Sequence, residues 1–277
     1  MTNKMSTQLY NKSGLFYILS TAIPWVFWFT AAYFSHSLSK ENDWISSSIG
    51  FLGLLAPFVI ALILMSKNRA VFQDFKSRFF NLNKGSIKYI FIACFLMLGS
   101  ILLAQLISLA FGYSANQFQI TGTYTFTSGV FPVWFLLIVA PLVEELAWHS
   151  YGTDTLRQRF SLFKTSMIFA LFWGLWHIPL SFIKDYYQSN LVESGAVYSM
   201  NFIVSLFPFV LIMNWLYYKS NRNIIIPIIF HITAGYFNEI FATHPMSKVI
   251  QTGMLILLSI YIIIKDKSFF FNTENNN

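Results

Sequence analysis

The sequence predicts an all-α fold, a polytopic bundle of about eight transmembrane helices with both termini in the cytoplasm. Three observations lead to this prediction: the composition, the length of the apolar segments and the distribution of basic residues. Of the 277 residues, 56% are hydrophobic and only 10% are charged, and the mean hydropathy is +0.56. Soluble domains carry roughly a quarter of charged residues. The composition therefore excludes a soluble enzyme, a disordered chain and a collagen-like rod.

The apolar residues are grouped into segments that match the thickness of a bilayer. A hydrocarbon core of roughly 30 Å requires about 20 apolar residues in a helix. Eight segments meet this length, at residues 14–34, 45–65, 87–112, 130–149, 165–183, 200–218, 224–243 and 248–265. Several contain a proline, which transmembrane helices tolerate because neighbouring groups satisfy the freed backbone. We expect one integral-membrane domain over residues 1–277.

Basic residues predict the orientation of the bundle. If the N-terminus is cytoplasmic, all but three of the 18 Lys and Arg residues fall in cytoplasmic segments, and the exceptions are Lys40, Lys184 and Lys248. Cytoplasmic loops carry an excess of Lys and Arg, so both termini are predicted to be cytoplasmic and the protein is predicted in the plasma membrane. The net charge of +7 needs no nucleic-acid partner, because lipid is the expected surroundings.

A few ionisable side chains lie inside the predicted spans. These are Glu144 and Glu145 in the fourth span, His177 in the fifth, and His231 and Glu239 in the seventh. An ionised side chain near the bilayer centre costs about 2.5–3.5 kcal/mol on insertion scales, so such residues are usually functional. The function must therefore be sought among these groups.

The spacing of the fourth span predicts how its carboxylates divide their roles. Glu145 and His149 are four residues apart and share one helix face, so one carboxylate is expected to bond His149. Glu144 would then project into the bundle. The alternative, that these carboxylates merely cap the end of the helix, is disfavoured because the C-terminus of a helix carries a partial negative charge.

The histidines of the fifth and seventh spans complete this group. His177 is flanked by Trp173 and Trp176, while His231, Gly235 and Asn238 form one stripe of the seventh span. Either histidine alone is equally consistent with a structural role in the core. Two histidines on neighbouring spans, together with two glutamates on a third, favour a metal site or a proton-transfer site.

Taken together, these segments resemble the CPBP intramembrane proteases, a family that includes the CAAX prenyl endopeptidases and bacteriocin-processing enzymes. The family signatures EExxxR, FxxxH and HxxxN correspond here to Glu144-Glu145-Leu146-Ala147-Trp148-His149, to Trp173-Gly174-Leu175-Trp176-His177 with Phe172 one place early, and to His231 through Gly235. The resemblance covers residues 130–240 and implies a catalytic core there. Two positions depart from it: His149 replaces the arginine and Gly235 replaces the asparagine.

The resemblance implies an endopeptidase that acts on a membrane-associated protein or peptide precursor. Glu144 would be the general base, His177 would hold the water or donate a proton, and His231 would stabilise the oxyanion. Asn238 would supply the missing amide, and His149 would orient Glu145.

The same side chains leave a metal-dependent route open. Glu144, His177 and His231 make a His₂Glu set suited to catalytic zinc, and Glu145 would then act as the base. The sequence does not distinguish a zinc-dependent mechanism from a metal-free one.

Two other classes of function keep charged groups in a membrane. A proton-coupled transporter would do so, but the two halves of the chain are not alike and the polar groups form one cluster. A non-catalytic immunity or interaction protein built on the protease fold is the other alternative. Loss of proteolysis on mutation of Glu144 or His231 would distinguish the enzyme from both.

Overall fold

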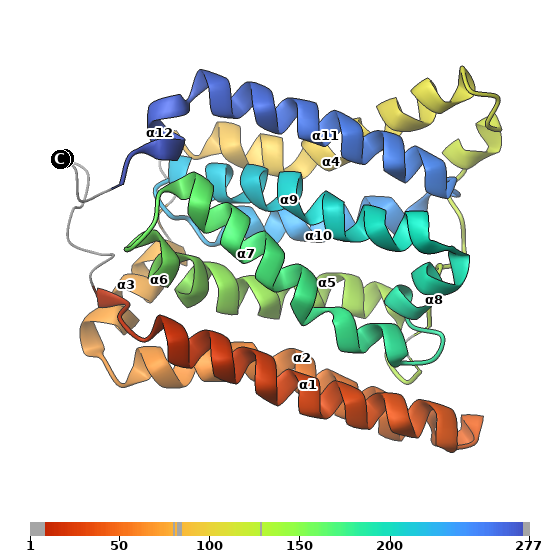
Figure 1. The fold of residues 1–277 in the computed structure, drawn as a ribbon, viewed down its shortest axis with the longest axis horizontal. Helices are drawn as coiled ribbons and strands as arrows, with labels where there is room; N and C mark the ends of the chain where they lie inside the picture. The colour runs from red at the N-terminus through yellow and green to blue at the C-terminus, as the bar shows by residue number, and fades with distance from the viewer. Residues whose placement is uncertain (1–8, 80, 82–84, 128, 274–277) are drawn as a thin grey trace.

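The computed structural model describes residues 9–79, 81, 85–127 and 129–273 (Figure 1). Its long helices are α1 (Ser13–Ser37), α2 (Asp43–Ser66), α4 (Ile87–Leu109), α5 (Val133–Ala147), α7 (Leu162–Trp176), α9 (Ala196–Lys219), α10 (Ile225–Ile240) and α11 (Pro245–Lys265). Shorter helices are η2 (Lys40–Asn42), α3 (Arg69–Phe79), η3 (Ala115–Phe118), the π-turn η4 (Trp148–Gly152), α6 (Thr153–Arg157), η5 (Ile178–Phe182), α8 (Tyr187–Ser194) and α12 (Lys267–Phe271). The predicted helical bundle is confirmed.

The eight predicted spans correspond to eight apolar helical segments, of which seven are long enough to cross a bilayer. The exception is α10, whose 16 residues extend about 24 Å. It is shorter than the predicted span 224–243 because the chain after Ile240 pairs with the loop that precedes α5. Thr121 donates its backbone N–H to the Ile240 carbonyl over 2.7 Å, and Ala242 donates to Gln119 over 2.9 Å.

The helix α10 lies in the interior of the bundle, against α4, α5 and α9. The pair α1 and α2 packs along one side and contacts the rest through α5, η4 and η5, while α4 and α11 lie on the opposite side (Figure 1). Both ends of the described chain lie at the same end of the bundle, near α3, α6 and α12. The cytoplasmic location of the termini stays a prediction, and two residues used for it, Lys4 and Lys84, lie outside the described part of the chain.

The fourth and fifth spans depart from regular helix where the candidate site residues lie. Helix α5 continues through the π-turn η4, which contains His149, into α6; such turns are frequent at functional sites. The fifth span changes from α7 to the 3₁₀ helix η5 at His177, because Pro179 has no N–H to continue the helix.

The contact between α1 and α2 depends on a glycine. Gly53 lies against Trp28, and a Cβ added at Gly53 would be 2.7 Å from the indole nitrogen. That nitrogen donates to the Gly50 carbonyl over 2.9 Å, and the Trp28 ring packs against Trp176 with centroids 4.5 Å apart. The indole therefore has little freedom to move away.

We expect Gly53→Ala to destabilise the protein by about 1–3 kcal/mol, the usual cost of overpacking. Thermal unfolding of the detergent-solubilised protein measures the effect. Gly99→Ala is the matched control, because no atom lies within 4 Å of the added Cβ. If both variants unfold at the same temperature, the close contact with Trp28 does not constrain the helix pair.

Candidate functional site

Glu145 is the centre of a buried group of polar side chains. It is fully buried, with one carboxylate oxygen bonded to His149 Nδ1 and the other 2.8 Å from His231 Nδ1. The other ring nitrogen of His149 lies 2.9 Å from Asn214 Oδ1. The predicted bond between Glu145 and His149 is therefore confirmed, and helix α9 contributes a partner that sequence reasoning missed.

Asn214 links His149 to helix α7 through two hydrogen bonds. The Asn214 amide nitrogen donates to Ser166 Oγ over 2.9 Å, so its oxygen is the atom that faces the imidazole. Both ring nitrogens of His149 thus face oxygen atoms that accept hydrogen bonds. His149 occupies the position at which the motif carries arginine. Only one feature of the sequence could have indicated a role for Asn214: it is an amide side chain inside an otherwise apolar segment.

Glu144 has a separate environment, as predicted. It is 7% exposed, and its Oε2 accepts the indole N–H of Trp173 over 3.0 Å. Trp173 occupies the phenylalanine position of the second motif, and only the tryptophan has an N–H to donate. His177 Nδ1 donates to the Trp173 carbonyl over 2.6 Å, which leaves its Nε2 available to other groups.

Four of the six predicted site residues line a cavity of about 270 Å³ between α4, α5, α7, α9, α10 and α11, whereas Glu145 and His149 lie outside its lining. Its lining includes Glu144, His177, His231, Gly235 and Asn238. Most of the remaining wall is apolar and comes from Leu137, Phe202, Leu206, Phe209 and Leu255. The Asn238 side chain also donates to the Ala234 carbonyl over 2.9 Å.

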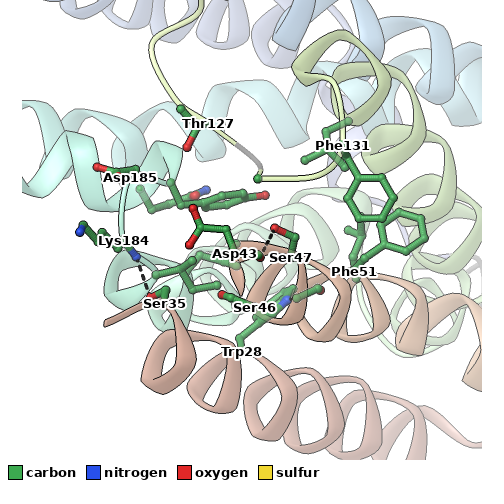
Figure 2. A pocket seen from close by; sticks show the side chains of 18 of the residues that line it. Trp28, Ser35, Asp43, Ser46, Ser47, Phe51, Thr127, Phe131, Lys184 and Asp185 are labelled. Carbon is green, nitrogen blue, oxygen red and sulfur yellow. Dashed lines mark hydrogen bonds between the residues drawn. The ribbon is translucent and has the colours of Figure 1, made fainter. Parts of the chain in front are cut away.

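Glu144 and His177 also line a second cavity, of about 190 Å³, which lies between the pair α1–α2 and α5. Figure 2 shows Trp28 and Ser46 on its wall, and its polar lining residues include Asp43, Lys184 and Asp185. Two interactions fix its walls: the Lys184 backbone donates to Ser35 Oγ, and the rings of Phe51 and Phe131 pack together. Glu144 thus lines cavities on both sides of α5.

Comparison with known proteins identifies the family. Residues 125–237, which contain all three motifs, match the family described as type II CAAX prenyl endopeptidase Rce1-like. The CAAX prenyl protease 2 of Methanococcus maripaludis is 39% identical over 269 residues, which cover 96% of this chain and 98% of that protein. The chain belongs to the CAAX prenyl endopeptidase family. It is an integral-membrane protease of the endopeptidase class, and the transporter and immunity-protein alternatives are not favoured.

The structure supports the protease assignment but not the zinc site that the sequence left open. In the part of the chain that the structure describes, no three His, Cys, Asp or Glu side chains form a group that would hold a metal ion. As they are arranged here, the three predicted ligands do not fit a zinc ion.

Two tyrosines beside the larger cavity remain neutral. Burial raises the pKa of Tyr186 and of Tyr187, so neither phenol ionises in the physiological range. They add hydrogen-bonding capacity to the cavity wall without adding charge. Their contribution to the site is therefore polar rather than ionic.

We expect His149→Phe to destabilise this protein by about 2–3 kcal/mol, because Glu145 and Asn214 lose a buried hydrogen-bonding partner. The ring keeps most of its volume, so the change isolates the hydrogen bonds. Thermal unfolding in detergent measures the loss. His36→Phe, at an exposed position of α1, should shift the unfolding temperature far less. Equal stability of both variants would show that the bonds of His149 contribute nothing.

Proposed function

We propose that this protein hydrolyses a peptide bond in prenylated CAAX-type proteins or peptides, with a water molecule activated by Glu144. The observation that carries the proposal is the position of Glu144, which lines a largely apolar cavity of about 270 Å³ inside a membrane-spanning bundle. Such a cavity suits a lipidated chain, and a relative 39% identical over 269 residues is named a CAAX prenyl protease. The catalytic core comprises residues 130–240, with α5, α7 and α10 supplying the reacting groups.

In the proposed reaction, Glu144 and Nε2 of His177 hold the water. Glu144 removes a proton as the water attacks the carbonyl carbon, and it then delivers that proton to the leaving amine. The proton thus moves from water to product, and no other reactant is required. Glu145 and His149 take no proton; Glu145 holds His231, and His149 holds Glu145.

His231 would stabilise the oxyanion. Glu145 bonds its Nδ1, which leaves Nε2–H of the protonated ring to donate to the developing negative charge. Asn238 lies two turns, about 10.5 Å, further along α10, and its amide nitrogen donates to the Ala234 carbonyl, so His231 alone would contact the oxyanion. Gly235 brings no side chain to the position where the motif carries asparagine, and the nearest neighbour of that space is Leu137, which would lie 3.6 Å from a Cβ added at Gly235.

Three lysines line the two cavities. Lys40 and Lys184 line one cavity and Lys248 the other. These are the three basic residues that the positive-inside pattern assigns away from the cytoplasm. Under the predicted orientation, these three lysines lie toward the non-cytoplasmic face.

The experiment uses the full-length protein in liposomes and two quenched fluorescent peptides of identical sequence, one prenylated and one not. We expect cleavage of the prenylated peptide, with mass spectrometry giving a single bond, and much slower cleavage of the other. Equal rates would remove the prenyl group from the substrate assignment. Failure to cleave either peptide, or any panel of CAAX-type sequences, would overturn the proposed function.

A further inference from the structure

One charged side chain in the larger cavity takes no part in the proposed hydrolysis. Lys248 belongs to the first turn of α11, and among the described residues that line this cavity it is the only lysine or arginine. Its side chain is 17% exposed. The ammonium lies 3.4 Å from Glu239 Oε1 and 5.9 Å from the centre of the Tyr187 ring. A cation is costly in such surroundings unless it has a function or a strong partner.

Glu239 is a weak partner for this ammonium. Its Oε2 already accepts two hydrogen bonds from Thr125, at 3.1 Å from the backbone N–H and 2.7 Å from the hydroxyl. The bond to Lys248, at 3.4 Å, is longer than the roughly 2.7–2.9 Å typical of an ammonium bonded to a carboxylate. An ammonium has three N–H donors. The geometry leaves Lys248 able to bind a second carboxylate that enters the cavity.

The spacing of His231 and Glu239 along α10 gives the distance from the reacting groups to the partner of Lys248. His231 lies at the level of Glu145, and Glu239 follows it by eight residues on the same helix. Eight residues of α-helix rise about 12 Å. An extended peptide advances at most about 3.3–3.6 Å per residue. The distance from the oxyanion donor to the partner of Lys248 is therefore that of three or four peptide residues.

We infer that Lys248 binds the C-terminal carboxylate of the substrate. This inference rests on the proposed function, because it assigns part of the same substrate. Lys248 would act as a specificity residue that orients the chain. The amide groups in the first turn of α11 add partial positive charge at the same place.

The test compares three prenylated peptides with the same sequence: one with a free C-terminal carboxylate, one with a C-terminal amide, and one lengthened by three residues. We expect the wild-type protein to show a KM about tenfold lower for the free acid than for the amide, as for one lost charge-assisted hydrogen bond. Lys248→Met should raise the KM of the acid to that of the amide with little change in kcat. Lys248→Arg should keep the preference.

Lys265→Met removes the same charge from the other end of α11 and serves as the matched control. It should keep the preference for the acid. The lengthened peptide should be cleaved at a bond displaced toward its new end, or with the KM of the amide. Equal KM values for acid and amide in the wild type, or an undiminished preference in Lys248→Met, would overturn the role of Lys248 while the proteolysis itself stands. Absence of cleavage of all three peptides would instead overturn the proposed function.

Discussion

Replacing Glu144 by glutamine should lower kcat for peptide cleavage by about 10²–10⁴-fold, the range that a general base contributes. Glutamine keeps the volume of the side chain and an oxygen to accept the Trp173 indole N–H, so the local structure should persist. What it loses is the ability to take a proton from water. Single-turnover cleavage of the prenylated peptide in liposomes measures the effect.

The control for this prediction is Glu193→Gln, which neutralises an exposed carboxylate on α8. Its kcat should equal that of the wild type. Thermal unfolding of Glu144→Gln should show no loss of stability, which separates a chemical defect from a folding defect. Full activity of a folded Glu144→Gln protein would contradict its role as general base and leave Glu145 as the candidate.

The second large effect is expected at Arg78, far from the motifs in sequence. Arg78 is 2% exposed and donates to Asp154 over 2.8 Å and to the backbone carbonyls of His149 and Ser150 over 3.0 and 2.7 Å. It thus holds the π-turn that carries His149. Arg78→Met leaves Asp154 with one cation, Arg222, beside the hydroxyls of Tyr217 and Tyr218, and should destabilise the protein by about 3–5 kcal/mol, the cost of breaking a buried ion pair. Chemical unfolding in detergent measures this loss.

Arg159→Met, at an exposed position after α6, is the matched control and should change stability little. Arg78→Lys should fall between the two, because an ammonium keeps the charge but lacks the planar set of five donors. A fully stable Arg78→Met protein would mean that Arg222 alone compensates Asp154.

From the sequence, Arg78 and Asp154 were expected to lie in loops between the spans. The structure instead buries both, with Arg222 bonded to Asp154 over 2.5 Å from the turn before α10. The predicted fourth span ended at residue 149 because polar residues follow it, whereas the buried segment continues to Arg157. Polar composition alone cannot distinguish a solvated loop from a paired buried cluster, because the partners come from distant segments.

What the sequence by itself determined was local. Apolar segment length defined the membrane-spanning helices, and the four-residue spacing of Glu145 and His149 predicted their bond, since both follow from the rise and repeat of one helix. Three motifs indicated the protease family.

The tertiary structure decided which groups from different helices face one another. It brought His231 to Glu145, Trp173 to Glu144 and Asn214 to His149, and it set Lys248 at the wall of the cavity. The rotation and depth of each helix depend on how large side chains pack against neighbours remote in sequence, and no periodicity within a single helix contains that information.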